Sequence, residues 1–503
     1  MKKKQVNRRK FIGTVSSGAA AFTIVPRHVL GKGHVPPSDK INVANIGCGT
    51  QGLREMPDMF RNEDIHVAAI CDVNKYTTDY LDWSSRGIVQ GIARTLEKKD
   101  WGKYIKGVPG GRDIMEEYVN TYYSNKYGKE NYTACKVYED YRELFEKETD
   151  IDAVKIMTPD HSHGPIAMTA MKKGIHVITH KPISNRLIEG LKVIDGVEKY
   201  NVRSHLLAWE DKPNYRLIKQ WIDDGVIGTL REIHNWSMRP VWPQFTNVPK
   251  ETPSIPQGFN WQLWLGPEKD RPYHPNYTHN VFRGWYDFGG GSMCDMGHYS
   301  LFPLFRTLSI DKAPLTVRAL SSTTRTSKNN VCMNVNNKAA FPGSCIVKFR
   351  FGNQTGTGPF DLFWYDGGMR PFAPEELEDE GKDLALEGMM FVGDDGKILA
   401  GFEGEDPRIL NKQTRDSYGG DLTVDVPVVE KKSVTWAKAI KSGEESPGSF
   451  LYARNLTETL NLGAVALRTK KRIEYDAETR KVTNSGRANR FMDRDYREGW
   501  EIV

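Results

Sequence analysis

The feature that most constrains the fold is a glycine-rich turn, Gly47-Cys48-Gly49-Thr50-Gln51-Gly52, which directly follows the apolar run 40–46. In this pattern the first glycine permits a tight turn and the second lets a pyrophosphate approach the backbone. The third lets the following helix pack closely on the strand. The amides at the start of that helix then point at the phosphates. The turn therefore predicts a dinucleotide-binding strand, turn and helix.

An acidic residue strengthens this prediction. A second apolar run, 66–71, ends in Asp72, twenty residues after Gly52. A carboxylate at this distance is typical of the group that binds the hydroxyls of the adenosine ribose. The same carboxylate would repel a 2′-phosphate, so the sequence favours NAD over NADP as the cofactor.

Strands and helices continue to alternate further along the chain. Helical spacing at 141–145 and apolar runs at 153–157 and 175–178 predict a parallel, doubly wound sheet. The intervening segment 75–134 is rich in Tyr, Lys and Gly, and we expect a long surface insertion with some helix. Residues 40–205 are therefore assigned to a Rossmann domain.

Polar residues follow the two later strands. Thr158-Pro159-Asp160-His161-Ser162-His163 comes after the third strand, and Lys181-Pro182 after the fourth. Ligands of doubly wound sheets bind at the carboxyl ends of the strands. We therefore expect Thr158, Pro159, His161, His163 and Lys181 to contact the cofactor. Lys181, if desolvated there, would have a lowered pKa suited to acid–base catalysis.

Residues 206–503 form a second region in which strands dominate. Five of the twelve tryptophans lie within 236–288, together with several arginines. Aromatic rings match the C–H face of a sugar, and the candidate substrate contacts in this segment are Trp236, Arg239, Arg283 and Trp285. Packing within the loop, or contact with another subunit, is the alternative role for these residues. The predicted strands are 230–236, 317–321, 344–351 and 360–365, and a hairpin is predicted to turn through 393–396.

Taken in order, these elements resemble the glucose-fructose oxidoreductase/inositol dehydrogenase (Gfo/Idh/MocA) family. The resemblance rests on the glycine turn, Asp72, the loop 158–163, Lys181-Pro182, and Gly289-Gly290-Gly291 ahead of Asp295 and His298. It covers nearly the whole chain from residue 40. It implies an α/β protein with an N-terminal Rossmann domain. The C-terminal α/β domain of the family is built on a large open, mainly antiparallel sheet, and its outer face often forms dimers.

The resemblance also implies a function. Members of the family move a hydride to or from a sugar or cyclitol, and the matching residues here give Lys181, Asp295 and His298 catalytic roles, with Tyr299 beside the substrate. Two positions depart from the family pattern. His180 replaces the usual Glu before Lys-Pro, and His298 is three residues after Asp295 instead of four, where Tyr299 stands. Residues three and four apart share one face of a helix, so His298 is still expected to face the substrate.

Residues 1–33 are interpreted as an export signal and linker. Arg8-Arg9-Lys10 precedes an apolar stretch, running to Val25, that is too short to span a bilayer. The pattern resembles a twin-arginine signal and predicts an exported, periplasmic protein without a stable membrane anchor; an uncleaved amphipathic N-terminus is the alternative.

The first 32 residues hold eight of the 70 basic residues and no acidic one, so the rest of the chain has 62 basic and 64 acidic residues. A slightly acidic body argues against nucleic acid as a partner.

The sequence leaves three functions open. The first is an NAD-dependent oxidoreductase acting on a sugar or cyclitol with a tightly bound cofactor, as a homo-oligomer. The second is an NAD-dependent glycosidase that oxidises a sugar carbon transiently, unlike enzymes that use paired carboxylates. The third is a sugar-binding homologue without catalysis. No metal is expected, because the carboxylate spacing needed for a site at the histidines is lacking.

Overall fold

The computed structural model describes residues 39–128, 135–418 and 430–502. The chain divides into an N-terminal unit through Lys40 and a second unit that starts at Ile41. The predicted export signal, residues 1–33, lies outside the described residues. Within the described ranges, no helix has both the length and the apolar character needed to cross a membrane.

The first half of the second unit is a six-stranded sheet in the order β3-β2-β1-β4-β5-β6. Every neighbouring pair is parallel, which confirms the predicted Rossmann sheet. The strand order reverses between β1 and β4, and ligands of such sheets bind at this switch point. The strands are β1 (Ile41–Ile46), β2 (Ile65–Cys71), β3 (Lys136–Tyr138), β4 (Ala153–Ile156), β5 (His176–Thr179) and β6 (Ser204–Leu206).

Helices pack on this sheet, and one of them corrects the expectation for residues 75–134. The segment contains α5, which packs on β2 and buries Met115, Tyr118 and Val119. The α5 part of the segment therefore belongs to the core and not to a surface insertion, because α5 makes the crossover between β2 and β3, while the expected helix content is confirmed. The helices of this half are α3 (Thr50–Arg61), α4 (Gly87–Thr95), α5 (Arg112–Tyr127), α6 (Tyr141–Lys147), α7 (His163–Lys172) and α8 (Leu187–Lys199).

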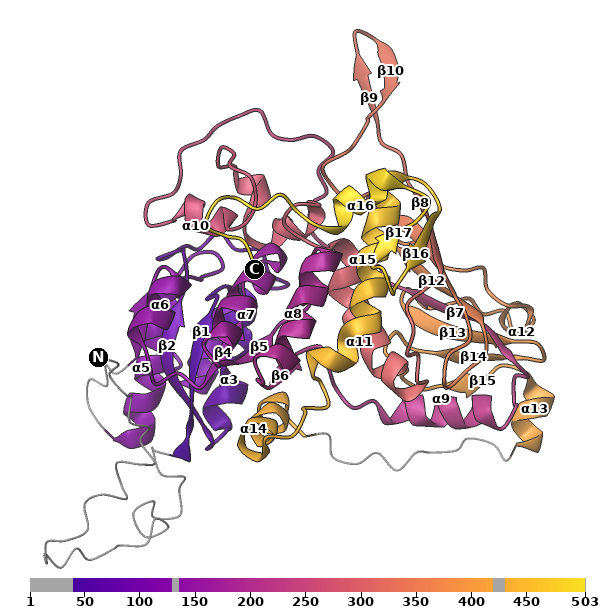
Figure 1. Cartoon of the computed structure of the whole chain (residues 1–503), viewed down its shortest axis with the longest axis horizontal. Helices are drawn as coiled ribbons and strands as arrows, with labels where there is room; N and C mark the ends of the chain where they lie inside the picture. The colour runs from indigo at the N-terminus through magenta and orange to yellow at the C-terminus, as the bar shows by residue number, and fades with distance from the viewer. Residues whose placement is uncertain (1–38, 129–134, 419–429, 503) are drawn as a thin grey trace, which may run out of the picture. The chain divides into compact units, whose positions relative to one another are not determined.

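The second half contains a nine-stranded sheet in the order β15-β14-β13-β7-β12-β11-β8-β16-β17. Only the β7–β12 pair is parallel, so the sheet is mainly antiparallel, as the resemblance implied. Its strands are β7 (Leu230–Trp236), β8 (Thr316–Ser321), β11 (Cys345–Phe351), β12 (Phe360–Asp366), β13 (Gly388–Gly393), β14 (Lys397–Ala400), β15 (Arg408–Ile409), β16 (Ile473–Asp476) and β17 (Lys481–Val482). A separate hairpin, β9 (Arg325–Lys328) with β10 (Val331–Asn334), projects from the body in Figure 1.

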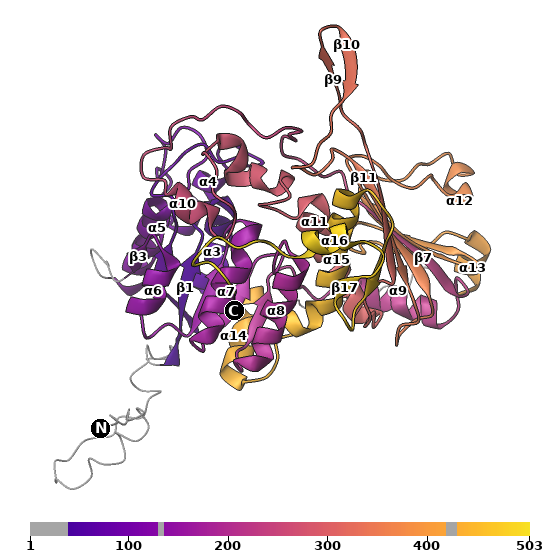
Figure 2. The same ribbon diagram turned by 45° about the horizontal axis from the view of Figure 1, so that its top comes forward.

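Three helices connect the two sheets. Figures 1 and 2 show α8, α11 (Gly291–Thr307) and α15 (Arg454–Thr469) between them, and α15 packs on both α8 and α11. One apolar core runs through these helices into both sheets, which fixes α11 relative to the loop after β5. The remaining helices are α9 (Pro213–Asp223), α10 (Trp261–Leu265), α12 (Glu375–Glu378), α13 (Lys412–Ser417), α14 (Lys432–Ser442) and α16 (Gly486–Met492), with short 3-10 turns at η2 (Asp160–Ser162), η3 (Pro275–Tyr277), η4 (His279–Gly284) and η5 (Phe450–Ala453).

Candidate active site

A cavity lies at the carboxyl ends of the parallel strands, next to the switch point. Its wall combines loops that follow β1, β2, β4 and β5 with residues of α11 and of the segment after β7. The predicted site residues on this wall are Gly47, Gly49, Thr50, Gln51, Asp72, Thr158, Pro159, Lys181, Arg239, Arg283, Asp295 and Tyr299. Residues from distant parts of the sequence therefore meet where the fold predicts a ligand.

The glycine turn has the geometry that a dinucleotide requires. Gly47 has φ +100°, and a Cβ there would lie 2.5 Å from the carbonyl carbon of Met157. A Cβ on Gly52 would lie 2.4 Å from the carbonyl oxygen of Gly47, so α3 could not pack as closely on β1. No side chain caps α3, and Gly49, Thr50 and Gln51 lie on the cavity wall. The start of this helix is therefore available to bind an anion such as a pyrophosphate.

Two polar groups on the wall fit the rest of a dinucleotide. The Asp72 carboxylate is held in place because Oδ2 accepts from the Cys48 amide at 2.5 Å and Oδ1 from the Asn74 amide at 2.7 Å. Burial raises the pKa of this carboxyl, although the two amides oppose the shift. Across the described residues, the buried Thr158 hydroxyl has no hydrogen-bond partner. A carboxylate and an orphan hydroxyl in one cavity are suited to ribose hydroxyls and a carboxamide.

The two histidines of the loop after β4 lie behind the wall and not on it. His161 is fully buried, and its ring nitrogens face the carbonyl oxygens of Trp264 at 2.8 Å and Phe288 at 3.3 Å. His163 lies between the carbonyl oxygens of Pro182 at 2.6 Å and Thr158 at 2.8 Å. His163 therefore joins the loop after β4 to the Lys181-Pro182 loop. The structure gives both histidines positioning roles, because backbone carbonyls occupy their nitrogens.

Lys181, Arg283 and Asp295 meet at one oxygen. Lys181 Nζ donates a hydrogen bond to Asp295 Oδ1, and Arg283 Nε lies 3.2 Å from the same atom. Burial favours the protonated acid, but the two cations outweigh it and lower the pKa of Asp295 to about 2. Burial also lowers the pKa of Lys181, against the attraction of Asp295. Asp295 is therefore ionised at neutral pH, and it holds the Lys181 ammonium at the wall.

On α11 the structure turns Tyr299, and not His298, toward the cavity. His298 is fully buried, and its Nδ1 donates to the Cys294 carbonyl oxygen at 2.8 Å. Burial lowers the pKa of His298 to about 3, and within the described part of the chain its Nε2 has no partner. Tyr299 lies on the wall with Lys181 Nζ 5.0 Å from its ring centroid. One residue shifts a helical side chain by about 100°, which explains why the fourth position after Asp295 reaches the cavity.

The side chains at the two positions that depart from the family pattern, His180 and Tyr299, contact each other. The Tyr299 hydroxyl lies 3.0 Å from His180 Nε2. Behind this pair, Glu55 Oε1 lies 3.6 Å from the same imidazole nitrogen. Burial, reinforced by the neighbouring Lys181 charge, lowers the pKa of His180 well below its usual range. A neutral imidazole therefore stands between a phenol on the wall and a carboxylate behind it.

Two tryptophans that were predicted as substrate contacts lie away from the cavity. The Trp236 indole packs with Tyr365 and Met390 and donates to the Ala385 carbonyl oxygen at 2.9 Å. Trp285 is buried in an aromatic cluster and donates to the Asn276 carbonyl oxygen at 2.6 Å. Neither ring lines the cavity, because both indole nitrogens are bound to backbone inside separate packed clusters. The wall instead takes aromatic rings that were not proposed, among them Tyr80, Trp83 and Trp500.

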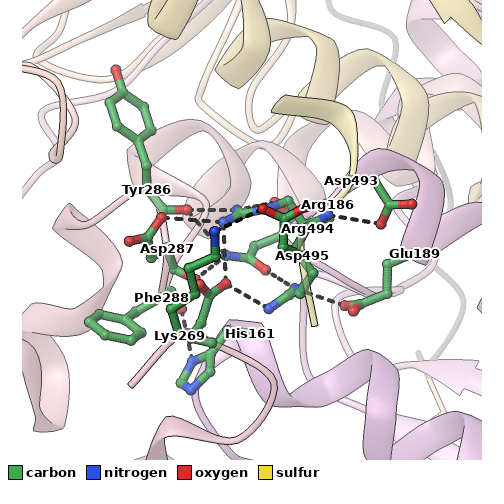
Figure 3. A network of polar contacts seen from close by, with 12 residues as sticks. His161, Arg186, Glu189, Lys269, Tyr286, Asp287, Phe288, Asp493, Arg494 and Asp495 are labelled. Atoms are coloured by element: carbon green, nitrogen blue, oxygen red, sulfur yellow. Dashed lines mark hydrogen bonds and ion pairs between the residues drawn. The ribbon is translucent and has the colours of Figure 1, made fainter. Parts of the chain in front are cut away.

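Trp500 reaches the wall through a C-terminal segment anchored by buried charges (Figure 3). Arg494 donates to Glu189 at 2.9 Å and to Glu268 at 2.8 Å, and Arg186 also reaches Glu268 at 3.2 Å. All four side chains are at most 7% exposed. Removing one partner of such a pair leaves an uncompensated buried charge, so the network fixes this segment against α8.

Among the described residues, no group of three His, Cys, Asp or Glu side chains is arranged to hold a metal ion.

Two family models match parts of this chain. The NAD-binding Rossmann fold of the Gfo/Idh/MocA oxidoreductase family matches residues 119–207, and the family's C-terminal alpha/beta domain matches residues 214–340. The WlbA dehydrogenase from Bordetella pertussis, solved with NADH and UDP-GlcNAcA, has a TM-score of 0.50 at 13% identity, covering 87% of this chain and 99% of that one. At this identity the likeness concerns the fold alone.

Curated relatives match over shorter stretches. Levoglucosan dehydrogenase from Pseudarthrobacter phenanthrenivorans is 31% identical over 127 residues, which is 24% of this chain and 31% of that protein. Alpha-N-acetylgalactosaminidase from Shewanella oneidensis is 24% identical over 263 residues, which is 47% of this chain and 48% of that protein. The chain thus spans less than half the length of either relative.

Proposed function

We propose that this chain, which matches models of both Gfo/Idh/MocA domains over residues 119–207 and 214–340, is an oxidoreductase that uses NAD to oxidise or reduce a carbinol carbon of a sugar or cyclitol. The observation that carries the proposal is the cavity shared by the glycine turn and the Lys181–Asp295 pair. NAD, when bound, supplies the hydride acceptor or donor. The levoglucosan dehydrogenase match supports the sugar class of substrate.

The cofactor-binding residues have separate tasks. The start of α3 would hold the pyrophosphate, and Gly47 and Gly52 allow the turn to be this tight. Asp72 would bind the adenosine ribose hydroxyls with the carboxylate positions left free by the Cys48 and Asn74 amides. A carboxylate in this place repels a 2′-phosphate, which supports NAD over NADP.

The proton of the substrate hydroxyl would leave through Tyr299. As the substrate oxygen gives its proton to the Tyr299 oxygen, the phenol proton passes to His180 Nε2, 3.0 Å away. Glu55, 3.6 Å from that nitrogen, offsets the positive charge that forms on the imidazole. Burial raises the pKa of Tyr299 well above its usual value, so the phenol holds its proton until the transfer occurs. Lys181, fixed by Asp295, would donate a hydrogen bond to the substrate oxygen.

A second candidate function is the NAD-dependent glycosidase. The match to alpha-N-acetylgalactosaminidase over 263 residues supports it. In this reaction a sugar carbon is oxidised transiently, the aglycone is eliminated, water adds to the unsaturated ketone that remains, and the hydride returns, so the net result is hydrolysis. Both functions use the same cavity and the same cofactor.

The cellular location is also a proposal, and it rests on residues 1–33 of the sequence. Arg8-Arg9 and the apolar stretch after them support export to the periplasm, and a tightly bound cofactor would suit a compartment with little free NAD. Fusion of residues 1–33 to a reporter that is active only after export tests this point. A reporter that stays inactive contradicts it.

One experiment separates the functions. The purified full chain is loaded with NAD and incubated with a panel of sugars, cyclitols and aryl glycosides, while absorbance of the reduced cofactor, ketosugar and free aglycone are measured. Oxidoreduction predicts ketosugar or reduced cofactor, and glycosidase activity predicts aglycone without net reduction. Lys181→Ala should abolish turnover, and Lys192→Ala, at an exposed position on α8, should not. Sugar binding without either product would overturn both enzymatic proposals.

A further inference from the structure

One cation on the cavity wall forms no ion pair with any of the described residues. Arg239 follows β7, and its guanidinium lies 4.4 Å from the ring centroid of Trp83. The Nε of Arg239 is buried and has no hydrogen-bond partner in residues 39–128, 135–418 and 430–502. No ion pair involves Arg239 in these ranges either, although its charge is close enough to help lower the pKa of Asp295.

The other wall charges away from the glycine turn are already matched. Arg54 pairs with Asp82, and Glu403 pairs with Lys212 at 2.6 Å. Around Asp295, by contrast, Lys181 and Arg283 both pair with that carboxylate, and Arg239 adds a third cation. The Asp160 carboxyl lies behind this wall and also interacts with Lys181 and Arg283, but burial raises its pKa. The substrate end of the cavity therefore has more positive than negative charge.

Trp83 places this unmatched charge at the mouth of the cavity. The indole is 64% exposed, which is unusual for tryptophan, and it belongs to the segment between β2 and α4. Stacking on an aromatic face fixes the position of the planar guanidinium while leaving its N–H edge open. That edge matches the two oxygens of a carboxylate in a bidentate pair.

We propose that the substrate carries an anionic group, namely the carboxylate of a sugar acid, which binds Arg239 above Trp83. This inference rests on the proposed function, because it names the substrate class of the same cavity. The carboxylate would supply the missing counter-charge, while the hydroxyl-bearing carbon faces Lys181 and Tyr299. A phosphate can also pair with an arginine through two oxygens, but it carries about −1.5 to −2 charges, whereas a carboxylate carries the single charge that Arg239 would match.

Binding to the NAD-loaded full chain tests the proposal directly. Isothermal titration calorimetry compares glucuronate and galacturonate with glucose and galactose, and with glucose 6-phosphate. Hydrogen bonds to charged groups imply that at least one sugar acid binds about 10- to 100-fold more tightly than its neutral parent. Tighter binding of the sugar phosphate than of either acid would instead assign Arg239 to phosphate and overturn the carboxylate.

Two variants locate the effect. Arg239→Met should remove the preference for the acid while leaving NAD affinity unchanged, and Arg239→Lys should restore only part of it. Arg231→Met is the matched control, since Arg231 lies on β7 but is exposed and pairs with Asp394. An unchanged preference in Arg239→Met would refute the inference. If neutral sugars are turned over but acids are not preferred, this inference fails and the proposed function stands; if NAD does not bind, the proposed function fails.

Discussion

Replacing Asp295 with Asn removes a carboxylate that forms ion pairs with both Lys181 and Arg283. Asn keeps the shape of the side chain but leaves two cations in a buried site. Removing one partner of a buried ion pair typically costs about 3–5 kcal/mol. Lys181 can escape part of this cost by releasing its proton, because burial already lowers its pKa. We therefore expect Asp295→Asn to lower the free energy of unfolding by about 3 kcal/mol at pH 7.

The stability lost on Asp295→Asn should be smaller in acid than at neutral pH. The pKa of Asp295 is lowered to about 2 in the folded chain, from an ordinary value of 3.8. The ionised carboxylate thus stabilises the fold above about pH 4, and this contribution disappears as the pH falls through 2. A lowering of this size corresponds to about 2 kcal/mol. The difference between wild type and Asp295→Asn should therefore be constant near neutral pH and shrink in acid.

Urea unfolding of the cofactor-free chain, followed by both tryptophan fluorescence and circular dichroism, measures this effect. The double variant Lys181→Met/Asp295→Asn is the control, because removing the buried ammonium together with its partner should recover much of the loss. A loss below about 1 kcal/mol at pH 7, or one that grows in acid, would refute the view that the cations depend on Asp295.

Four further outcomes follow from the same geometry. Tyr299→Phe should lower kcat by about 100-fold or more with NAD affinity unchanged, as measured by steady-state kinetics. His298→Gln should mainly lower the melting temperature measured by calorimetry. If His298 carried the proton, His298→Gln would instead show the large loss of kcat and Tyr299→Phe would not. Asp72→Ser should weaken NAD binding and lower the ratio of NAD affinity to NADP affinity in fluorescence titrations. An unchanged affinity ratio would contradict the role of Asp72. Trp500→Ala should speed loss of NAD from the loaded chain on gel filtration, because the indole lines the cavity; equal retention would exclude it from cofactor contact. Trp236→Phe should destabilise the chain without changing substrate affinity, since its indole donates to a backbone carbonyl away from the cavity; a higher KM would contradict that.

Local patterns predicted several residues that meet in the cavity. The glycine turn and Asp72 are set by backbone geometry within one strand–turn–helix unit, and the structure places both on the cavity wall. The helices within 75–134 were expected, but the buried position of α5 was not, because polar and tyrosine residues dominate the composition of this segment. The buried positions Met115, Tyr118 and Val119 nevertheless have helical spacing and could have indicated α5.

The substrate half depends on contacts that no local pattern contains. Side chains alternate between the faces of a strand, so the direction of Trp236 depends on what covers each face of the nine-stranded sheet. The choice between His298 and Tyr299 depends on one step along α11, and spacings of three and four are both compatible with one helix face. Trp83 and Trp500 come from segments far from the family motifs, and only the folded chain brings them to the cavity.

The two departures from the family pattern illustrate the same limit. In the sequence, His180 and Tyr299 are separate substitutions 119 residues apart, and each alone suggests a weakened catalytic site. In the structure they form one hydrogen bond of 3.0 Å on the wall next to Lys181. A carboxylate at position 180 would add a negative charge near Glu55, whereas in the proposed mechanism a neutral imidazole accepts the phenol proton and Glu55 offsets the charge that forms. We therefore propose that the two positions form one coupled change, in which Tyr299 would receive the substrate proton and His180 would accept the phenol proton.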